Sequence, residues 1–150
     1  MAIIIKKAEF KDLEPLYSIE KECFTIEAFS KKQIAALLQN PKSTNFLAKM
    51  DGETVGFIIA LTCERRGEKV GHILTVNVAA KARKKGVGFE LLKKMEKTLR
   101  EKGIRVCYLE VKTDNVEAHK LYKKLGYIET KLLKGFYPQG DGVRMKKTLQ

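Results

Sequence analysis

The sequence predicts an α/β protein in which one mixed sheet carries helices on both faces. Two observations lead to this fold class. Apolar runs on either side of Asp51-Gly52 have the pattern of a β-hairpin, whose strands are antiparallel. Other strand-like runs, before and after residues 86–102, are separated by a helical pattern of the kind that connects parallel strands. A sheet that contains both kinds of connection is mixed.

The first 41 residues predict one strand and two helices. Residues 2–8 are rich in β-branched side chains and predict a strand. Residues 10–24 have apolar side chains at helical spacing, and Pro15 is compatible only with the first turn of that helix. Ser30 and Gln33 fit a capping box at the start of a second helix, which ends before Pro41.

The rest of the chain predicts six strands and two helices. They are strand 45–50, strand 53–62, strand 70–79 after a polar loop at 64–69, helix 86–102, strand 106–111, helix 115–124, strand 127–133 and strand 143–149. Asn115 is placed as an N-cap, and Gly103 and Gly126 stand where the two helices end. Residues 136–142 are expected to form a loop between the last two strands.

Length and composition limit the class of protein. A chain of 150 residues with 44% hydrophobic side chains predicts one folded domain over residues 1–150 with a packed core. No apolar run approaches the roughly 18 residues of a membrane-spanning helix, and the first residues lack the pattern of a secretory signal. The three scattered cysteines indicate reduced thiols. We therefore expect a cytoplasmic protein without a membrane partner.

The positive charge is concentrated in the second half of the chain. Residues 1–75 contain 11 Lys and Arg against 10 Asp and Glu, whereas residues 76–150 contain 19 against 8. Such a basic half is typical of a protein that binds nucleic acid, an acidic protein surface or a phosphorylated cofactor. Composition leaves all three open.

A basic segment with two glycines lies between a predicted strand and a predicted helix. Gly86 and Gly88 follow four basic residues, and they allow a backbone to approach a ligand closely. The helix start offers unpaired N–H groups to an anion. The spacing fits neither a dinucleotide fingerprint nor a Walker A loop. These features indicate a pyrophosphate site, and a basic turn that only starts a helix is the alternative.

Two segments resemble motifs of one enzyme family. Residues 83–88 resemble the R/Q-x-x-G-x-G/A motif of GNAT acetyltransferases, although Ala80 stands where many relatives have proline. Residues 109–127 resemble the L-E-V-x-x-x-N-x-x-A-x-x-L-Y-x-x-x-G-F/Y signature of RimI-type and archaeal N-terminal acetyltransferases. The likeness is close over residues 70–150 and holds in outline over residues 1–69. It implies the GNAT fold, with a mixed, mostly antiparallel central sheet between helices, and acetyl-coenzyme A as cosubstrate.

The resemblance also implies which residues bind the cofactor. They are Val76, Asn77, Val78, Arg83, Lys84, Lys85, Gly86, Val87, Gly88, Phe89, Asn115 and Tyr122. The strand before the loop would contribute backbone groups, with the Val78 amide at the thioester carbonyl. Asn115 can cap its helix in any fold, so that only its ligand contact depends on the resemblance. No metal is required.

Glu110 and Tyr122 are the expected catalytic residues. Glu110 is a carboxylate in an apolar strand, and burial there is expected to raise its pKa toward that of a general base; a glutamate paired with a lysine is the alternative. The resemblance places the Tyr122 hydroxyl near the coenzyme sulfur as general acid, whereas an isolated tyrosine is usually a core residue. Glu110, through a water, would free the α-amine for direct attack on the thioester.

The acceptor side rests on Phe29, Glu110 and Tyr137. Residues 136–142 resemble the Y-Y-x-x-x-x-D loop that covers the acceptor peptide in RimI-type enzymes, which makes Tyr137 a candidate for holding the peptide backbone; packing within a hairpin is the alternative. Phe29 is expected to line the pocket for the first side chain, with a hydrophobic staple as the alternative. His72 is interpreted as structural, because a single histidine without partners in sequence is more often so.

The sequence thus predicts an enzyme that acetylates the α-amino group of protein or peptide amino termini. Ribosomal proteins, and an association with the ribosome, are suggested by the resemblance alone. Acetylation of lysine side chains or small amines is the first alternative. A basic nucleic-acid-binding module is the second, but the sequence has no RNP motif, zinc motif or basic ribbon with interleaved aromatic residues, so that no specific nucleic acid is expected.

Overall fold

A computed structural model describes residues 2–24 and 27–149. Its elements are β1 Ile4–Lys7, α1 Leu13–Cys23, α2 Lys31–Gln39, β2 Ser43–Met50, β3 Glu53–Arg65, β4 Glu68–Val78, α3 Val87–Glu101, β5 Val106–Lys112, α4 Val116–Lys124, β6 Ile128–Tyr137 and β7 Gly140–Thr148. Short 3-10 turns at Phe10–Asp12 and Ala80–Ala82 precede α1 and α3. The order of strands and helices is the predicted one. No helix of the described residues is both long and apolar enough to cross a membrane.

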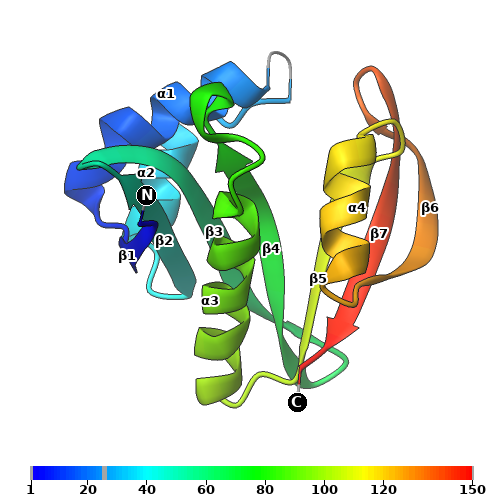
Figure 1. The fold of residues 1–150 in the computed structure, drawn as a ribbon. Helices are drawn as coiled ribbons and strands as arrows, with labels where there is room; N and C mark the ends of the chain where they lie inside the picture. The colour runs from blue at the N-terminus through cyan, green and yellow to red at the C-terminus, as the bar shows by residue number, and fades with distance from the viewer. Residues whose placement is uncertain (1, 25–26, 150) are drawn as a thin grey trace.

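The strands form one seven-stranded sheet in the order β1-β2-β3-β4-β5-β7-β6. Neighbouring strands are antiparallel, except that β4 and β5 are parallel. The chain leaves β4, crosses through α3 and returns as β5, which is the usual way to connect parallel strands. The predicted mixed, mostly antiparallel sheet is therefore confirmed (Figure 1).

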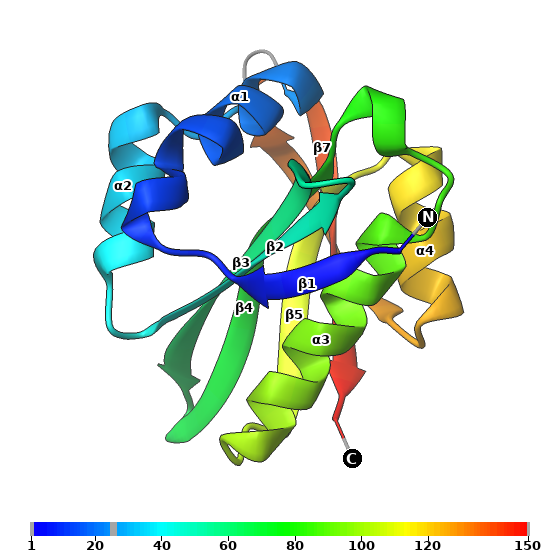
Figure 2. The same cartoon turned by 60° about the vertical axis from the view of Figure 1, so that its left-hand side comes forward.

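Helices cover both faces of the sheet, as predicted (Figures 1 and 2). One core cluster joins α1 and α2 to the first face and includes Leu16, Ile34 and Phe57. A larger cluster on the opposite face contains the apolar side of α3 and the buried Tyr122 of α4. The alternation along each strand separates the two clusters, because successive side chains point to opposite faces.

The sheet divides into two arms beyond the first residues of β5. β4 and β5 are paired at Gly71–Cys107 and His72–Tyr108, and the pairing stops there. Two residues further along β4, Leu74 is an extra residue, because the register of β3 and β4 shifts there. Such a bulge bends its strand. The first arm (β1–β4 with α1–α3) and the second arm (β5–β7 with α4) therefore diverge (Figure 1). We call the space between them the seam.

Two of the predicted loops are shorter than the sequence suggests. The polar loop 64–69 is a two-residue turn at Arg66 and Gly67, with φ of 53° and 80°, so that β3 and β4 extend to meet it. Its geometry matches the predicted Asp51-Gly52 turn, with φ of 53° and 78°. Likewise, β6 continues to Tyr137 and β7 begins at Gly140, which leaves two residues between them. The backbone hydrogen bonds between strands form with charged and aromatic residues as well as with apolar ones. Hydrophobic periodicity therefore does not detect such extensions of a strand.

Candidate active site

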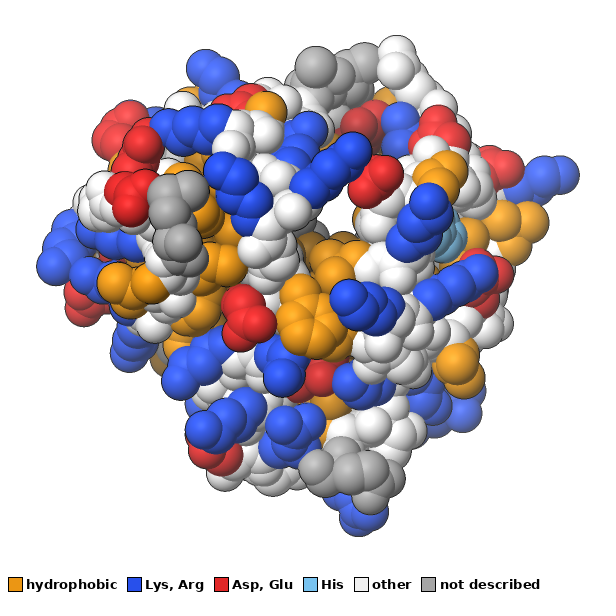
Figure 3. Space-filling model, viewed as in Figure 1, with side chains coloured by type: hydrophobic (Ala, Val, Ile, Leu, Met, Phe, Trp, Pro, Cys, Tyr) orange, Lys and Arg blue, Asp and Glu red, His pale blue; other side chains and the backbone are white. Residues whose placement is uncertain are grey.

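The seam is open on the side of α3 and α4. Figure 3 shows a hollow there, with hydrophobic side chains inside it and Lys and Arg side chains around it. Among the described strands, none pairs after His72 with the edge of β4 that faces the seam. The N–H of Ala79 donates to the Val55 carbonyl of β3 (2.7 Å), so the alternation of the strand turns the N–H of Val78 away from β3. The Val78 amide thus faces the seam.

The loop between β4 and α3 forms an anion-attracting rim on the seam. Lys84 and Gly86 have positive φ (62° and 85°), and Gly86 is an N-cap without a capping side chain. The first-turn N–H groups of α3 have no intrahelical partner, and they carry the positive end of the helix dipole. Arg83, Lys84 and Lys85 are exposed beside them. This local geometry suits an anion, and a pyrophosphate site here stays a prediction.

The two glycines of this loop have different physical roles. A side chain at Gly86 would meet nothing within 4 Å, so Gly86 is needed for its left-handed conformation. A Cβ at Gly88 would lie 3.2 Å from Leu121 of α4 and 3.8 Å from Val78. Gly88 therefore allows the Leu121 side chain of α4 to lie close against the start of α3.

The three residues expected to contact the cofactor from β4 do not all face the same way. Val76 and Val78 pack with the core cluster of α3 and α4. The Asn77 side chain is buried on the opposite face, where its amide donates to Glu20 Oε1 (2.6 Å) and Thr75 Oγ1 (2.8 Å). Only the backbone of Asn77 is available to a ligand in the seam.

α4 supplies Asn115 and Tyr122 from the second arm. The Asn115 side chain accepts a hydrogen bond from the Ala118 N–H (3.2 Å), which confirms the predicted cap. Tyr122 is buried, and burial and then the nearby Tyr137 raise the pKa of its hydroxyl. Within the described residues, the Tyr122 hydroxyl has no hydrogen-bond partner. Every fully enclosed side-chain polar atom of those residues does have a partner. The Tyr122 hydroxyl is therefore not fully enclosed and reaches accessible space.

Glu110 lies in β5, and its carboxylate contacts two side chains, those of His72 and Arg144. Its Oε2 accepts from Arg144 Nε of β7 (3.0 Å), the residue directly opposite in the register, and its Oε1 is 2.7 Å from His72 Nε2 of β4. Burial raises the pKa of Glu110, but His72 and Arg144 outweigh it and hold that pKa below its usual value. The expectation that burial would raise this pKa is therefore wrong, because the sequence did not show the two partners.

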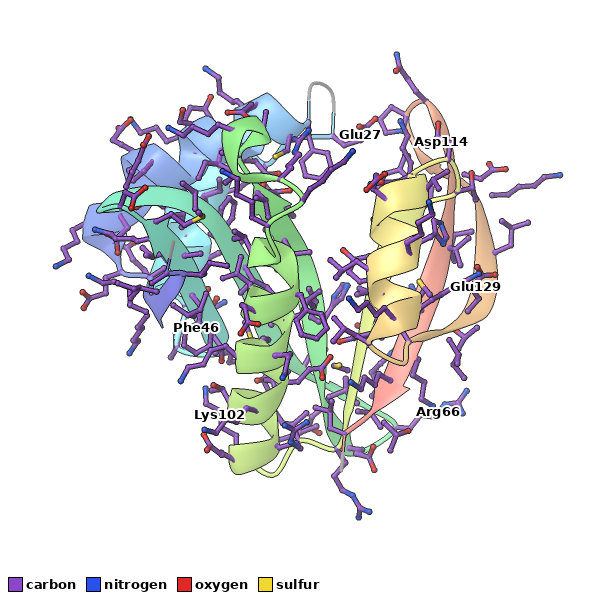
Figure 4. All side chains as sticks on the ribbon, viewed as in Figure 1. Glu27, Phe46, Arg66, Lys102, Asp114 and Glu129 are labelled. Carbon is purple, nitrogen blue, oxygen red and sulfur yellow. The ribbon has the colours of Figure 1, made fainter. Side chains whose placement is uncertain are left out.

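Tyr137, at the end of β6, lies in the same neighbourhood. Burial and the negative charges of Glu110 and Glu27 raise its pKa to about 12. Glu27, from the segment between α1 and α2, forms an ion pair with Lys112 at the end of β5 (3.4 Å). Figure 4 shows Glu27 beside the mouth of the seam. Glu110, Tyr137 and Glu27 thus approach one site from three separate segments.

Comparison with known proteins identifies the family. Residues 13–127 match the model of the Acetyltransferase (GNAT) family. The chain belongs to this family. An N-alpha-acetyltransferase of Sulfurisphaera tokodaii is 30% identical over 146 residues, with 91% of this chain and 87% of the relative covered. A [Ribosomal protein bS18]-alanine N-acetyltransferase of Haemophilus influenzae is 30% identical over 144 residues, with 94% and 92% covered.

Solved structures agree with the GNAT fold. The crystal structure of Ard1 from Thermoplasma volcanium superimposes with a TM-score of 0.91 at 28% identity and covers 100% of this chain and 99% of that one. The protein is thus a GNAT acetyltransferase, as the two motifs predicted. Among residues 2–24 and 27–149, no three His, Cys, Asp or Glu side chains are grouped as a metal site would require.

The two residues expected to be catalytic in this GNAT acetyltransferase belong to opposite faces of the sheet. Tyr122 packs with the cluster of α3 and α4, together with Leu109 and Val111 of β5. Glu110 lies between those two residues and therefore points to the other face. A molecule in the seam is accessible to both side chains, since the strands on either side are not paired there.

His72 and Glu27 are the site residues that the sequence reasoning missed. His72 stacks on Tyr108 of β5, with ring centroids 4.2 Å apart, and contacts Glu110. Its position follows only from the parallel register of β4 and β5, which no sequence pattern encodes. Glu27 lies in a connection without periodicity. An acidic residue shortly before a helix cap was the one available signal, and it is a weak one.

Phe29 has the structural role that the sequence offered as its alternative, that of a hydrophobic staple. It packs against the core cluster of α1 and α2, in which Ile34 is fully buried. Phe29 precedes the Ser30 cap and Ile34 is the fourth residue of α2, which is the arrangement of a hydrophobic staple. The capping box of Ser30 and Gln33 is confirmed. A contact between Phe29 and an acceptor stays a prediction.

Proposed function

We propose that the protein transfers the acetyl group of acetyl-coenzyme A to the α-amino group of a protein or peptide amino terminus. One observation supports this most directly. The seam presents a cationic helix start and an unpaired strand edge from the first arm, and a cluster of Glu110, Tyr137 and Glu27 at its mouth. The relatives named N-alpha-acetyltransferase support the same acceptor class.

In this proposal the first arm binds the coenzyme. The diphosphate lies against the N–H groups of Val87 to Phe89, with the Arg83, Lys84 and Lys85 side chains nearby. The pantetheine arm extends along the free edge of β4 from Val78 to Val76, where the backbone supplies hydrogen bonds. Asn115 and Tyr122 close the other side of the seam.

The acceptor enters beside Glu110. A substrate ammonium has an ordinary pKa of about 7.7–8.0, so that much of it is already neutral near pH 8. The low pKa of Glu110 makes this carboxylate a weak base, so it accepts a hydrogen bond from a water that takes the proton from the ammonium and passes it to solvent. Glu110 also attracts the ammonium before it loses the proton.

The reaction then proceeds by direct attack. The neutral amine nitrogen bonds to the thioester carbonyl carbon, and the Val78 N–H stabilises the oxyanion. The carbon–sulfur bond breaks as the intermediate collapses, and the thiolate takes a proton from the Tyr122 hydroxyl. The attacking nitrogen gives up its second proton, which restores the Tyr122 hydroxyl through solvent, and the amide remains on the acceptor. The Tyr122 hydroxyl is protonated at neutral pH, and because burial raises its pKa it donates that proton only as negative charge develops on the sulfur. Holding both reactants in one seam supplies part of the rate.

A peptide panel tests the acceptor class. Peptides that differ only in their first two residues are incubated with acetyl-coenzyme A, and thiol release is measured together with the position of the acetyl group by mass spectrometry. We expect acetylation of the free α-amine and none when that amine is blocked. Transfer only to a lysine side chain or a polyamine would overturn the α-amine assignment. Ribosomal amino termini belong in the panel because of the bS18-alanine N-acetyltransferase relatives; that target and a cytoplasmic location stay predictions.

A further inference from the structure

Glu20 is a buried carboxylate that the proposed chemistry does not use. It lies in α1 with 1% of its surface exposed. Its Oε1 accepts hydrogen bonds from Thr75 Oγ1 (3.0 Å) and Asn77 Nδ2 (2.6 Å), and its Oε2 accepts one from the N–H of Phe29 (3.0 Å). Burial raises its pKa, and the bonds from Phe29, Thr75 and Asn77 offset part of that rise. Among the described residues, no cationic side chain pairs with Glu20.

The three hydrogen bonds connect two parts of the molecule that meet at the seam. Two of them end on β4, whose free edge faces the proposed coenzyme. The third ends on Phe29, two residues after Glu27, which pairs with Lys112 of the second arm (3.4 Å) and lies near Tyr137. The segment 27–29 is thus attached to the second arm at one end and, through Glu20, to β4 at the other.

A buried charge without a cation is costly for a purely structural role. Replacing such a group by a well-packed apolar residue often leaves stability unchanged or increases it. Packing alone therefore does not account for Glu20, because Leu16 and Ile19 of the same helix fill the core without polar atoms. Glu20 also accepts a hydrogen bond from the backbone N–H of Phe29, which lies outside any helix or strand and next to the acceptor site. This role is more specific than packing.

We propose that Glu20 is a positioning residue for the acceptor site, because its carboxylate fixes residues 27–29 against β4. This inference rests on the proposed function. The segment then presents Glu27 to Lys112 and Tyr137 in one arrangement before the acceptor binds. Because residues 27–29 are already ordered, binding of the acceptor does not have to order them, and the apparent affinity for the acceptor is higher.

The Glu20→Gln variant distinguishes the bond that Oε2 accepts from Phe29 from the bonds that Oε1 accepts from β4. A glutamine can keep an oxygen toward Thr75 and Asn77, but its NH₂ group then faces the N–H of Phe29, so that a donor meets a donor. The opposite orientation would keep the bond to Phe29 only if the Asn77 amide turned over and the Thr75 hydroxyl reversed its direction, since both now donate to Glu20. We therefore expect the bond to Phe29 to be lost while the attachment to β4 is retained.

Two readouts follow, and one of them does not need activity. The first readout is the amide hydrogen exchange rate of Phe29, measured by NMR. We expect it to rise about tenfold, because the amide loses one hydrogen bond to a charged acceptor. The KM for the acceptor peptide is expected to rise about tenfold as well, whereas the KM for acetyl-coenzyme A and kcat change by less than about twofold. A general loss of structure would affect all three kinetic constants together.

Two control variants match the substitution. Thr75→Val removes a hydrogen bond from the same carboxylate but leaves the bond to Phe29, and we expect the acceptor KM and the Phe29 exchange rate to stay near those of the wild type. Glu96→Gln replaces another buried glutamate, on α3 and bonded to Tyr127 and Lys147 (2.9 and 2.7 Å). It is expected to lower stability without a selective rise in acceptor KM.

The outcomes distinguish this inference from the proposed function. If the wild type acetylates no peptide amino terminus, the proposed function is wrong, and Phe29 exchange still tests whether Glu20 holds the segment. If Glu20→Gln leaves Phe29 protected, or raises both KM values equally, Glu20 is not a positioning residue for the acceptor. Equal effects of Glu20→Gln and Thr75→Val on acceptor KM would overturn the inference in the same way.

Discussion

At the scale of single residues, Glu110 is the most informative position. Replacing it by Gln keeps the volume but removes the charge that faces His72 and Arg144. We expect kcat to fall about 100-fold, in the range lost with a general acid or base, and the KM for acetyl-coenzyme A to change little. Tyr122→Phe is expected to lower kcat in the same way. Steady-state kinetics with both substrates varied checks this, and wild-type kcat in both variants would contradict the catalytic assignment.

The acid side of the stability profile gives a second test of Glu110. Because its pKa is lowered on folding, its charged form contributes stability above the ordinary glutamate range, and this contribution is lost as the pH falls through the lowered pKa. The stability difference between wild type and Glu110→Gln is therefore expected to shrink as the pH falls from 6 toward 3. Urea unfolding at several pH values measures it. Glu20 has a raised pKa, so the corresponding difference for Glu20→Gln should change in the opposite direction.

At the scale of elements, the start of α3 is sensitive to side-chain volume. Gly88→Val would place a branched side chain where a Cβ already lies 3.2 Å from Leu121. We expect a loss of about 1–3 kcal/mol in the free energy of unfolding, typical of overpacking, and weaker binding of acetyl-coenzyme A as α3 moves away from α4. Urea unfolding and calorimetric titration measure the two effects. Unchanged affinity in a folded variant would show that the α3 start does not bind the coenzyme.

The elements were predictable where the signal is local. The capping box at Ser30, the Asp51-Gly52 turn and the apolar stripe of α3 each depend on residues a few positions apart, and all are present. The extended β6 and the contact between His72 and Glu110 were not predictable in this way. An edge strand with polar and aromatic residues has no clear alternation, and the contact depends on the register of two strands that are separated by a helix. The sequence therefore placed the motif residues on the correct strands and helices but did not show their electrostatic partners.

At the scale of the whole molecule, the seam exists because the two arms are joined over a short length. β4 and β5 share two register pairs, and a buried polar cluster adds a second connection, in which Tyr127 and Lys147 of the second arm donate to Glu96 of α3 (2.9 and 2.7 Å). Burial raises the pKa of Tyr127 and also that of Cys107, which lies 3.1 Å from the Tyr127 hydroxyl. This cluster lies at the closed end of the seam, and its Tyr127 ring packs against the Tyr122 ring, with centroids 5.8 Å apart.

Removing the centre of that cluster is expected to weaken both stability and cofactor binding. Glu96→Ala leaves a largely buried lysine and a tyrosine hydroxyl without their acceptor, which costs about 3 kcal/mol in the free energy of unfolding. The angle between the arms is then less fixed, so we also expect the Kd for acetyl-coenzyme A to rise several-fold although Glu96 is not among the residues proposed to bind the coenzyme. The double variant Glu96→Leu with Lys147→Met removes the charge pair as a unit and should recover much of the stability. Urea unfolding and calorimetric titration of both variants decide whether the cluster sets the geometry of the seam: if stability falls but Kd stays at the wild-type value, the β4–β5 pairing alone holds the arms apart.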